Sequence, residues 1–193
     1  MTLFPVVLPV AEANHNLPGA ERVARLSRIA REALRLSAER SGVVMGELLK
    51  DEDDVPYPSN GNYWSLSHKP KCVAAVVSDK AIGIDIDEIR PRQKSAFNLV
   101  ASEEEWKLGK DRSWESFFRY WTAKEAALKA VGIGMSGLKK CRVASIPDEN
   151  HMLLEYQDRI FQIEQLYYRN HIVSVLKDDN EIRWVIATDF SHY

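Results

Sequence analysis

Apolar residues recur every three or four positions over two long stretches of the chain, and this spacing is typical of helices that bury one face. The pattern predicts a first helix from Ala20 to about Arg40, with arginines along its polar side. It predicts a second helix from about Ser113 to Val131, which ends at Gly132. Between them, residues Gln93 to Leu108 are predicted to be helical, with Ser102 as an N-cap before three glutamates.

Shorter runs of apolar or alternating residues predict β-strands around these helices. The predicted strands are Leu3–Val10, Tyr63–Ser67, Cys72–Ser78, Ala81–Ile89, Met152–Tyr156, Ile160–Tyr168, Ile172–Leu176 and Ile182–Thr188. A long helix followed by antiparallel strands therefore occurs twice along the chain. This element order suggests two related halves, although the halves share no obvious residue pattern.

The composition is that of a globular protein. The chain has 193 residues, of which 45% are hydrophobic and 28% charged, and its formal net charge is −2. This length suits one domain, or two small subdomains that share a core. The balance of acidic and basic residues argues against a general nucleic-acid binder, but it is compatible with a local basic pocket.

No apolar run approaches the roughly 20 residues that a membrane helix needs. The apolar start of the chain contains two prolines and no basic residue before Arg22, which argues against a signal peptide. Cys72 and Cys141 lie in neither a CxxC motif nor a metal-spaced cluster, so we expect both to be reduced packing residues. These features predict a cytoplasmic protein.

The first candidate site is the alternating strand from Ile82 to Glu88. Its isoleucines predict a core-facing side, and the other side then carries Asp85 and Asp87, about 7 Å apart along the strand. Gly83 beside them leaves room for a ligand to approach the backbone. Two like charges this close favour a bound cation, but alternating acids are also ordinary on the exposed side of a half-buried strand.

The second candidate lies on the predicted helix 113–131. At about 100° per residue, Lys124 falls inside the apolar stripe, and Glu125 and Lys129 fall together on its border. A lysine in an apolar stripe is costly unless its ammonium meets an anion. The alternatives are that Lys124 reaches past its neighbours to solvent, and that Glu125 and Lys129 form an ordinary surface pair.

The third candidate is the segment Ser67-His68-Lys69, which ends a predicted strand just before Pro70. Its hydroxyl, imidazole and ammonium groups are donors that suit a phosphate group. Loops often contain such residues, so the segment alone is a weak signal.

Taken in order, these three segments resemble the motifs of the 4'-phosphopantetheinyl transferase superfamily, in particular its larger members of the surfactin-synthetase-activating type. The family carries an SH motif, a GxD-x-E/D motif and a W-x-x-K-E-x-x-x-K motif. They correspond here to Ser67-His68, to Gly83-x-Asp85-x-Asp87 and to Trp121-x-x-Lys124-Glu125-x-x-x-Lys129. Outside residues 65–129, the resemblance extends over most of the chain, but there the elements match in type more than in residues.

The resemblance implies an α+β fold, a pseudo-dimer of two similar helix-plus-antiparallel-sheet halves with coenzyme A in the cleft between them. It implies a single domain over residues 1–193, with an N-terminal half of about 1–90 and a C-terminal half of about 91–193. The implied activity is that of a holo-[acyl-carrier-protein] synthase type of enzyme. Such an enzyme moves 4'-phosphopantetheine from coenzyme A to a serine of an apo acyl or peptidyl carrier protein and releases adenosine 3',5'-bisphosphate.

The resemblance also implies roles for individual residues. They are magnesium ligands (Asp85, Asp87 and Glu125), contacts of coenzyme A (Ser67, His68, Lys124 and Lys129) and the base that takes the serine proton (Glu105 or Glu125). Lys129 is in addition expected to hold the transferring phosphoryl group in line.

Two departures from the family pattern bear on this site. Asp87 stands where many members have glutamate, which shortens the reach of its carboxylate. Upstream of the SH motif, where the family often has a lysine or arginine, residues 51–54 are acidic and Lys50 is the only nearby cation. Arg22 on the first helix is then a candidate to hold the 3'-phosphate instead.

The expected partners are coenzyme A and an apo carrier protein, with no nucleic acid and no membrane. A monomer is expected, because two halves within one chain already complete the cleft. Two other functions compete with the enzyme: a non-catalytic carrier-protein or nucleotide-binding module on the same fold, and an unrelated magnesium-dependent phosphohydrolase. The complete set of acids and lysines favours the transferase.

Overall fold

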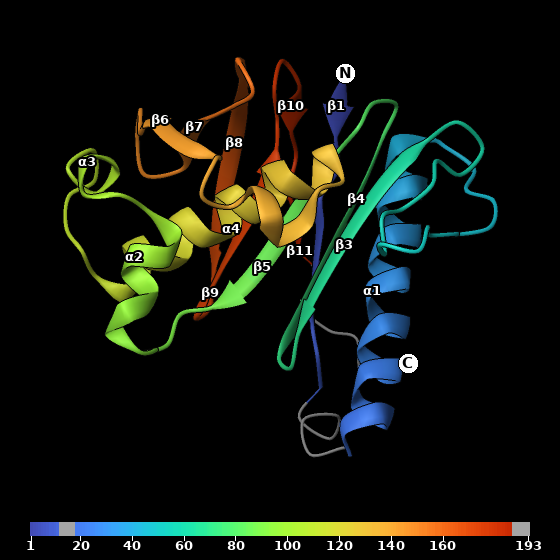
Figure 1. The fold of residues 1–193 in the computed structure, drawn as a ribbon. Coiled ribbons are helices and arrows are strands. Elements are labelled where there is room, and N and C mark those ends of the chain that lie inside the picture. Colours follow the sequence, from blue (N-terminus) through green and yellow to red (C-terminus); the bar gives the residue numbers. More distant parts are fainter. Residues whose placement is uncertain (12–17, 187–193) are drawn as a thin grey trace.

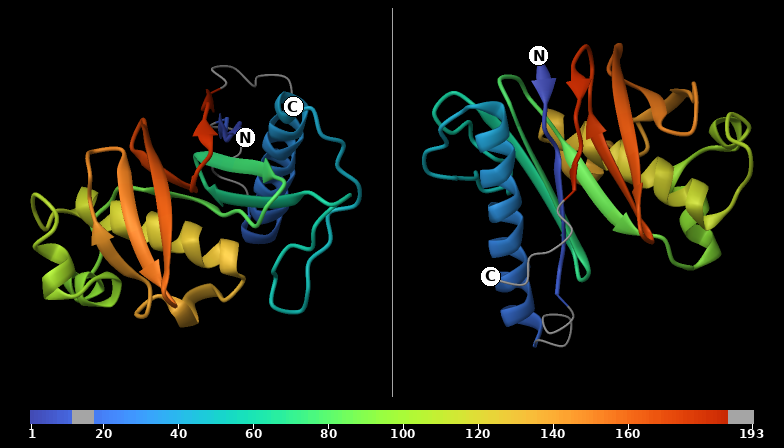
Figure 2. Two further views of the ribbon diagram at one scale, coloured as in Figure 1. Left: turned by 90° about the horizontal axis from the view of Figure 1, so that it is seen from above. Right: turned by 180° about the vertical axis from the view of Figure 1, so that it is seen from behind.

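The computed structural model describes residues 1–11 and 18–186. Its elements form two layers side by side, each a helix packed on a sheet (Figures 1 and 2). In the first layer, helix α1 (Gly19–Ser41) covers a four-stranded sheet. The strand order is β11 (Val185–Ile186), β2 (Val6–Pro9), β4 (Cys72–Ser78) and β3 (Tyr63–Lys69). Strand β4 pairs antiparallel with β2 and β3, and β11 runs parallel to β2.

In the second layer, helix α4 (Trp114–Val131) lies on a five-stranded antiparallel sheet. The strand order is β5 (Ile84–Glu88), β9 (His171–Leu176), β8 (Arg159–Tyr168), β7 (His151–Tyr156) and β6 (Arg142–Ser145). The remaining elements are the parallel pair β1 (Thr2–Leu3) and β10 (Glu181–Ile182), the helices α2 (Phe97–Val100) and α3 (Glu103–Trp106), and 3₁₀ turns at Lys94–Ala96 and Gly134–Gly137. The prediction of a mixed α+β fold with antiparallel sheets is confirmed.

Both long helices form where the hydrophobic spacing predicts them. Helix α4 follows Ser113, whose hydroxyl accepts a hydrogen bond from the backbone N–H of Ser116. It ends at Gly132, which has a φ of 75°. Only a residue that tolerates the left-handed region ends a helix in this way without strain, so this glycine fixes the end of α4 just beyond Lys129.

The predicted helical stretch Gln93–Leu108 is not continuous, and this prediction is corrected. The backbone is extended at Ala101 and Ser102, between α2 and α3. Ser102 forms a capping box with Glu105, in which each side chain bonds the other residue's backbone N–H. An N-cap residue needs non-helical dihedral angles, so this cap interrupts the helix that the acidic pattern otherwise favours.

Several predicted strands are shorter than expected. The predicted strand Leu3–Val10 is divided between β1 and β2 by Pro5, and the strand predicted from Ala81 begins only at Ile84. Strand β6 is absent from the prediction. The predicted strand Ile182–Thr188 is represented by β10 and β11, and its residues 187 and 188 lie outside the described residues.

Within the described residues, the chain passes from one layer to the other after β4 and again before β11. Strand β5 follows β4 in sequence, yet it pairs with β9 in the second sheet. Strand β11, near the other end of the chain, pairs with β2 in the first sheet. The expected division near residue 90 therefore does not coincide with the division between the sheets.

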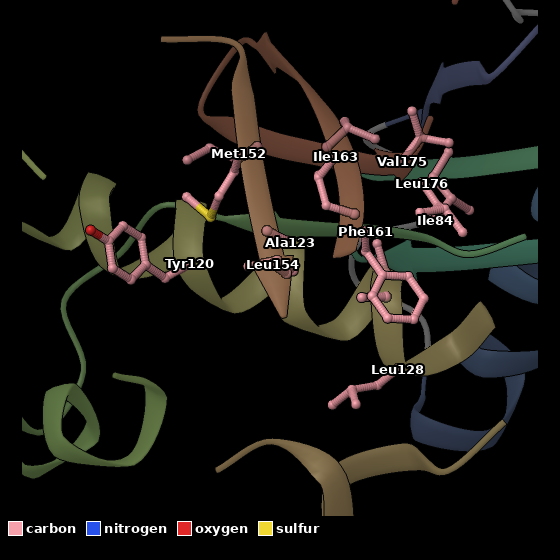
Figure 3. Packing of buried hydrophobic residues seen from close by; sticks show 14 of the residues in the cluster. Ile84, Tyr120, Ala123, Leu128, Met152, Leu154, Phe161, Ile163, Val175 and Leu176 are labelled. Atoms are coloured by element: carbon pink, nitrogen blue, oxygen red, sulfur yellow. The ribbon is translucent and has the colours of Figure 1, made fainter. Parts of the chain in front are cut away.

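The core of the second layer lies between α4 and its sheet. Figure 3 shows Tyr120 and Leu128 of α4 near Met152, Leu154 and Phe161 of β7 and β8. All five are almost fully buried. This packing fixes the helix on the sheet and thereby fixes the polar side chains along its border. Among the helices of residues 1–11 and 18–186, none combines the length and the apolar character of a transmembrane span.

Candidate functional site

Strands β3 and β5 lie side by side at the junction of the two layers, but side chains join them in place of a backbone ladder (Figure 1). The hydroxyl of Ser65 accepts a hydrogen bond from the backbone N–H of Ile84 at 3.1 Å. The hydroxyl of Ser67 donates to Oδ1 of Asp85 at 2.8 Å. Because alternate residues of a strand share a face, these serines attach one face of β3 to β5.

Lys69, the next residue on the same face of β3, contacts the second acid of β5. Its ammonium lies 3.0 Å from Oδ2 of Asp87. Asp85 and Asp87 are only 4% and 3% exposed, so the interpretation of these acids as the exposed side of a half-buried strand is wrong. The reason is that β3 covers the edge of β5, which the sequence around β5 alone does not reveal.

The glycine beside these acids serves helix packing. A Cβ atom added to Gly83 would lie 1.8 Å from the backbone oxygen of Ala126 in α4. The expectation that Gly83 leaves room for a ligand is therefore corrected, because the backbone of α4 already occupies that space. This close approach brings α4 next to the acidic side of β5.

Helix α4 adds a cation and a third carboxylate to the junction. The ammonium of Lys129 donates to Oδ1 of Asp85 at 2.7 Å and to the backbone oxygen of Ile84 at 3.0 Å. Glu125 lies one turn earlier on the helix and is half-buried. Within the described residues, Lys129 forms its ion pair with Asp85 and none with Glu125, so the alternative of a surface pair between Glu125 and Lys129 is excluded.

Two carboxylate oxygens at this junction are buried without a hydrogen-bond partner among the described residues, namely Oδ2 of Asp85 and Oε1 of Glu125. Burial raises the pKa of Glu125, and the nearby charge of Asp85 raises it further, although Lys129 opposes the shift. Burial lowers the pKa of His68 on β3, and the nearby charges of Lys129 and Lys69 lower it further. The junction thus contains carboxylates whose charges the nearby lysines do not fully neutralise. It also contains lysines whose charges disfavour protonation of His68.

This donor set fits a hard divalent cation, because buried carboxylate oxygens without partners are the ligands that Mg²⁺ prefers. Asp85 and Glu125 each supply one such oxygen. The carboxylate of Asp87 is instead paired with Lys69. Across residues 1–11 and 18–186, no three side chains form a complete metal-binding group. The structure therefore brings together part of the expected magnesium set, with lysines as its present counterions.

A pocket of about 290 Å³ opens beside these groups. Glu125 and Lys129 contribute to its wall, together with Ser65 of β3. Its other lining residues come from the loop before β3, from β3 itself and from the turn after α4, namely Lys50, Asp53, Asp54, Val55, Pro56, Trp64, Leu66, Gly132, Gly134 and Met135. A small polar group can reach both Glu125 and Lys129 through this pocket.

Glu105 and Lys124 meet each other away from this pocket. The ammonium of Lys124, with 1% of the residue exposed, donates to Oε1 of Glu105 at 2.6 Å and to the backbone oxygen of Val100 at 2.7 Å. Glu105 also accepts the backbone N–H groups of Ser102 and Val143. Lys124 therefore meets an anion as its place in the apolar stripe requires, and the alternative of a lysine reaching to solvent is excluded.

Burial by itself would raise the pKa of Glu105, but the hydrogen bond from Lys124 and those from the backbone lower it below the ordinary value. A buried carboxylate that is already bonded through both oxygens is a poor proton acceptor. These contacts hold α3, α4 and β6 together.

Arg22 lies in the first turns of α1 and is half-buried. Among the described residues, no hydrogen bond or ion pair joins its side chain to the junction. His68, by contrast, lies on β3 between Ser67 and Lys69, close enough to Lys129 for their charges to interact. Ser65 is a further site residue that the three motifs do not include, although it lies two residues before Ser67 on the same face of β3.

Comparison with known proteins gives consistent matches for the part of the chain that includes β5 and α4. The family model described as the 4'-phosphopantetheinyl transferase superfamily matches residues 81–185. The chain is 33% identical over 100 residues to the 4'-phosphopantetheinyl transferase HetI of Nostoc sp., covering 48% of this chain and 42% of the relative. It is 31% identical over 107 residues to the 4'-phosphopantetheinyl transferase AcpT of Salmonella typhi, covering 51% and 56%. The chain thus spans about half the length of the curated relatives it matches.

Proposed function

Since this chain belongs to the 4'-phosphopantetheinyl transferase superfamily, we propose that it transfers 4'-phosphopantetheine from coenzyme A to a serine of an apo acyl or peptidyl carrier protein. One observation carries the proposal. Lys129 and Asp85 form a close ion pair beside two buried carboxylate oxygens that lack partners among the described residues, at the wall of an open pocket. Cations and unpaired carboxylates in this arrangement suit the transfer of a phosphoryl group.

In the proposed reaction, the serine oxygen bonds to the phosphorus that carries pantetheine. The bond from that phosphorus to the bridging oxygen breaks, and adenosine 3',5'-bisphosphate leaves with the electron pair. The serine proton passes to a base. The protein therefore has to hold the pyrophosphate, neutralise the leaving group and accept one proton.

Lys129 is the residue proposed to hold the transferring phosphoryl group. Its ammonium is partly exposed and already bonded to Asp85, so it reaches both the acid cluster and the pocket. Asp85, Asp87 and Glu125 are the residues proposed to hold Mg²⁺. When bound, Mg²⁺ neutralises charge on the pyrophosphate and on the leaving group. Release of Lys69 from Asp87 would free the third carboxylate.

Glu125 is also the better supported of the two candidate bases. Its Oε1 has no hydrogen-bond partner among the described residues, and burial together with the charge of Asp85 raises its pKa, which makes it a stronger proton acceptor than Glu105. The oxygens of Glu105 are engaged by Lys124 and by the backbone. We therefore propose a structural role for Glu105 and Lys124.

Ser67 and His68 are proposed to contact coenzyme A at the end of β3. The support is that both residues lie on β3 beside Lys69, and that the charges of Lys129 and Lys69 act on His68. The assignment of Arg22 to the 3'-phosphate stays a prediction, because no contact among the described residues supports it.

We further propose that the two layers form a pseudo-dimer within one chain, with the junction of β3 and β5 as its cleft. The support is that a long helix covers a sheet in each layer. A chain built in this way completes its cleft without a second copy, so a monomer is proposed. A cytoplasmic location is supported by Cys72 and Cys141, which are buried free thiols.

The test is incubation of the protein with Mg²⁺, coenzyme A and an apo acyl carrier protein, followed by mass spectrometry of the carrier. A mass gain of one phosphopantetheinyl group on the carrier supports the transferase. A non-catalytic module would bind the nucleotide or carrier without any mass gain. A phosphohydrolase would consume coenzyme A and leave the carrier unchanged.

A further inference from the structure

The acid that Lys129 contacts belongs to a longer row of polar side chains under α4. Gln165 of β8 pairs in register with Ser174 of β9, and Ser174 pairs with Asp85 of β5. Residues that lie directly opposite each other on neighbouring strands share one face of the sheet. Each member of this row forms a hydrogen bond with α4. Asp85 is therefore one end of a row that continues, away from β3, beneath the earlier turns of the helix.

Gln165, Ser174 and Thr122 form a buried hydrogen-bond network in this row. Oε1 of Gln165 accepts a hydrogen bond from Nε of Arg119 at 2.7 Å, and its Nε2 donates to the backbone oxygen of Arg119 and to Oγ of Ser174, both at 2.9 Å. Oγ of Ser174 lies 2.7 Å from Oγ1 of Thr122, which donates its proton to the backbone oxygen of Phe118 at 2.8 Å. Thr122 therefore accepts the proton of Ser174, and the bonds of the network run in one direction.

The core of the second layer encloses this buried network. Gln165 is 2% exposed, and Thr122 and Ser174 are 0% exposed. Among the described residues that line the pocket beside Lys129, none belongs to the network. The apolar contacts around it are non-directional, so they persist when a helix slides or rotates slightly. Hydrogen bonds of 2.7–2.9 Å are directional and would not persist, so the network fixes α4 on the sheet in one position.

The position of α4 also sets the geometry of the candidate site. Thr122 and Lys129 are seven residues apart, which places them on the same side of α4 and about 10 Å apart along its axis. Glu125 lies between them, about one turn from each. A slide or rotation of α4 that breaks the contact between Thr122 and Ser174 therefore moves both charged groups. Their distances from Asp85 change with it.

We propose that Gln165, Ser174 and Thr122 are positioning residues for the transfer reaction. They act through α4, which carries Glu125 and Lys129 to the acids of β5. The inference rests on the proposed function and deepens it, since it names residues that set the geometry of that site. A displacement on the order of 1 Å at reacting groups can lower a rate by about 10²-fold. If the network served stability alone, its loss would leave kcat of the folded protein unchanged.

The experiment compares three variants with the wild type. Thr122→Val removes the hydroxyl and nearly keeps the shape of the side chain, whereas Thr122→Ser keeps the hydroxyl. Ile163→Val is the control for stability. Ile163 is buried in the same core, two residues before Gln165 on β8 (Figure 3), and the change removes one methylene without removing a hydrogen bond. All variants are compared at a temperature at which urea unfolding shows that they are folded.

Two readouts are needed. The first is kcat for transfer to an apo acyl carrier protein, and the second is the affinity for Mg²⁺ alone, measured by calorimetry without coenzyme A. Thr122→Val is expected to lower each by about tenfold, the lower end of the range for groups that orient metal ligands from outside. Thr122→Ser should restore both. Ile163→Val should lower the urea midpoint and change neither.

Two results would overturn the inference. The first is a folded Thr122→Val protein with the kcat and the Mg²⁺ affinity of the wild type. The second is an equal loss of both in Ile163→Val, because the loss would then follow stability and not the hydroxyl of Thr122.

A double-mutant cycle in the presence of a chelator separates this inference from the proposed function. Thr122→Val and Lys129→Met change residues about 10 Å apart that share no partner among the described residues, so their shifts of the urea midpoint should add if the residues are independent. We expect the double variant to lose less than the sum, because Thr122→Val alone already weakens the ion pair of Lys129 with Asp85. Additive shifts would overturn the inference. If the wild type transfers nothing and binds no Mg²⁺ while the shifts are non-additive, the proposed function fails and the positioning role stands.

Discussion

The ammonium of Lys129 lies 2.7 Å from Oδ1 of Asp85 and so ties the last turn of α4 to the beginning of β5. The same carboxylate accepts the hydroxyl of Ser67 from β3. One buried acid therefore joins three elements, of which β3 belongs to one layer and α4 and β5 to the other. A change at either partner should affect both the cleft and the stability of the junction.

Replacing Lys129 with alanine should lower kcat/KM for transfer by at least about 10²-fold, the scale for loss of one electrostatic contact to a transition state. It should also destabilise the chain, because the carboxylate of Asp85 is buried and loses its cation. Steady-state kinetics and urea unfolding measure the two effects. The double variant Lys129→Met with Asp85→Asn should regain stability but no activity. Near-normal turnover in Lys129→Ala would remove this lysine from the mechanism.

Glu125 should make the metal-free protein less stable as pH rises. Burial and the nearby charge of Asp85 raise its pKa in the folded chain, so the unfolded chain releases this proton at lower pH. The free energy of unfolding should therefore fall as pH rises through the interval between the unfolded and the folded pKa, and it is measured with a chelator because bound Mg²⁺ would favour the ionised carboxylate. Glu125→Gln should therefore be inactive yet more stable than the wild type at neutral pH. A less stable Glu125→Gln at that pH would contradict the assigned environment.

Glu105 should behave in the opposite way. Its pKa is lowered, so its contribution to stability is present above the ordinary glutamate pKa and is lost as pH falls through the lowered value. Glu105→Gln should destabilise the chain by about 3–5 kcal/mol at neutral pH, because the ammonium of Lys124 is left buried and unpaired. The double variant Glu105→Leu with Lys124→Met should recover much of this loss. If the double variant regains transfer activity together with stability, Glu105 has a structural role. If the double variant is stable but inactive, Glu105 takes part in catalysis.

The long helices and the burial of Lys124 follow from sequence, because local spacing determines both. Hydrophobic periodicity predicts α1 and α4, and the apolar stripe requires an anion for Lys124, which proves to be Glu105. The burial of Asp85 could not be predicted in this way. It depends on β3, whose contact with β5 runs through side chains and leaves no ladder pattern in the sequence.

The same limit explains the mistaken interpretation of Gly83. A glycine in an alternating strand signals that something approaches closely, but spacing does not reveal whether a ligand or a helix does so. The backbone oxygen of Ala126 fills the space, and that residue lies far along the chain. The gap in the predicted helix 93–108 has a more local cause, because the capping box around Ser102 was visible in the sequence and takes precedence over the helical pattern.

Gly83→Ala tests whether the close approach of α4 to β5 sets the geometry of the site. The added methyl group would lie 1.8 Å from the backbone oxygen of Ala126, so strand and helix have to separate. Such overpacking costs about 1–3 kcal/mol or more, and a displacement on the order of 1 Å at the reacting groups can lower the rate by about 10²-fold. Gly19→Ala is the matched control, because a Cβ atom at Gly19 meets nothing within 4 Å. The midpoint temperature of thermal unfolding and kcat should both fall in Gly83→Ala. Both should stay near the wild-type values in Gly19→Ala. If Gly83→Ala keeps full activity, the positions of Glu125 and Lys129 do not depend on this contact.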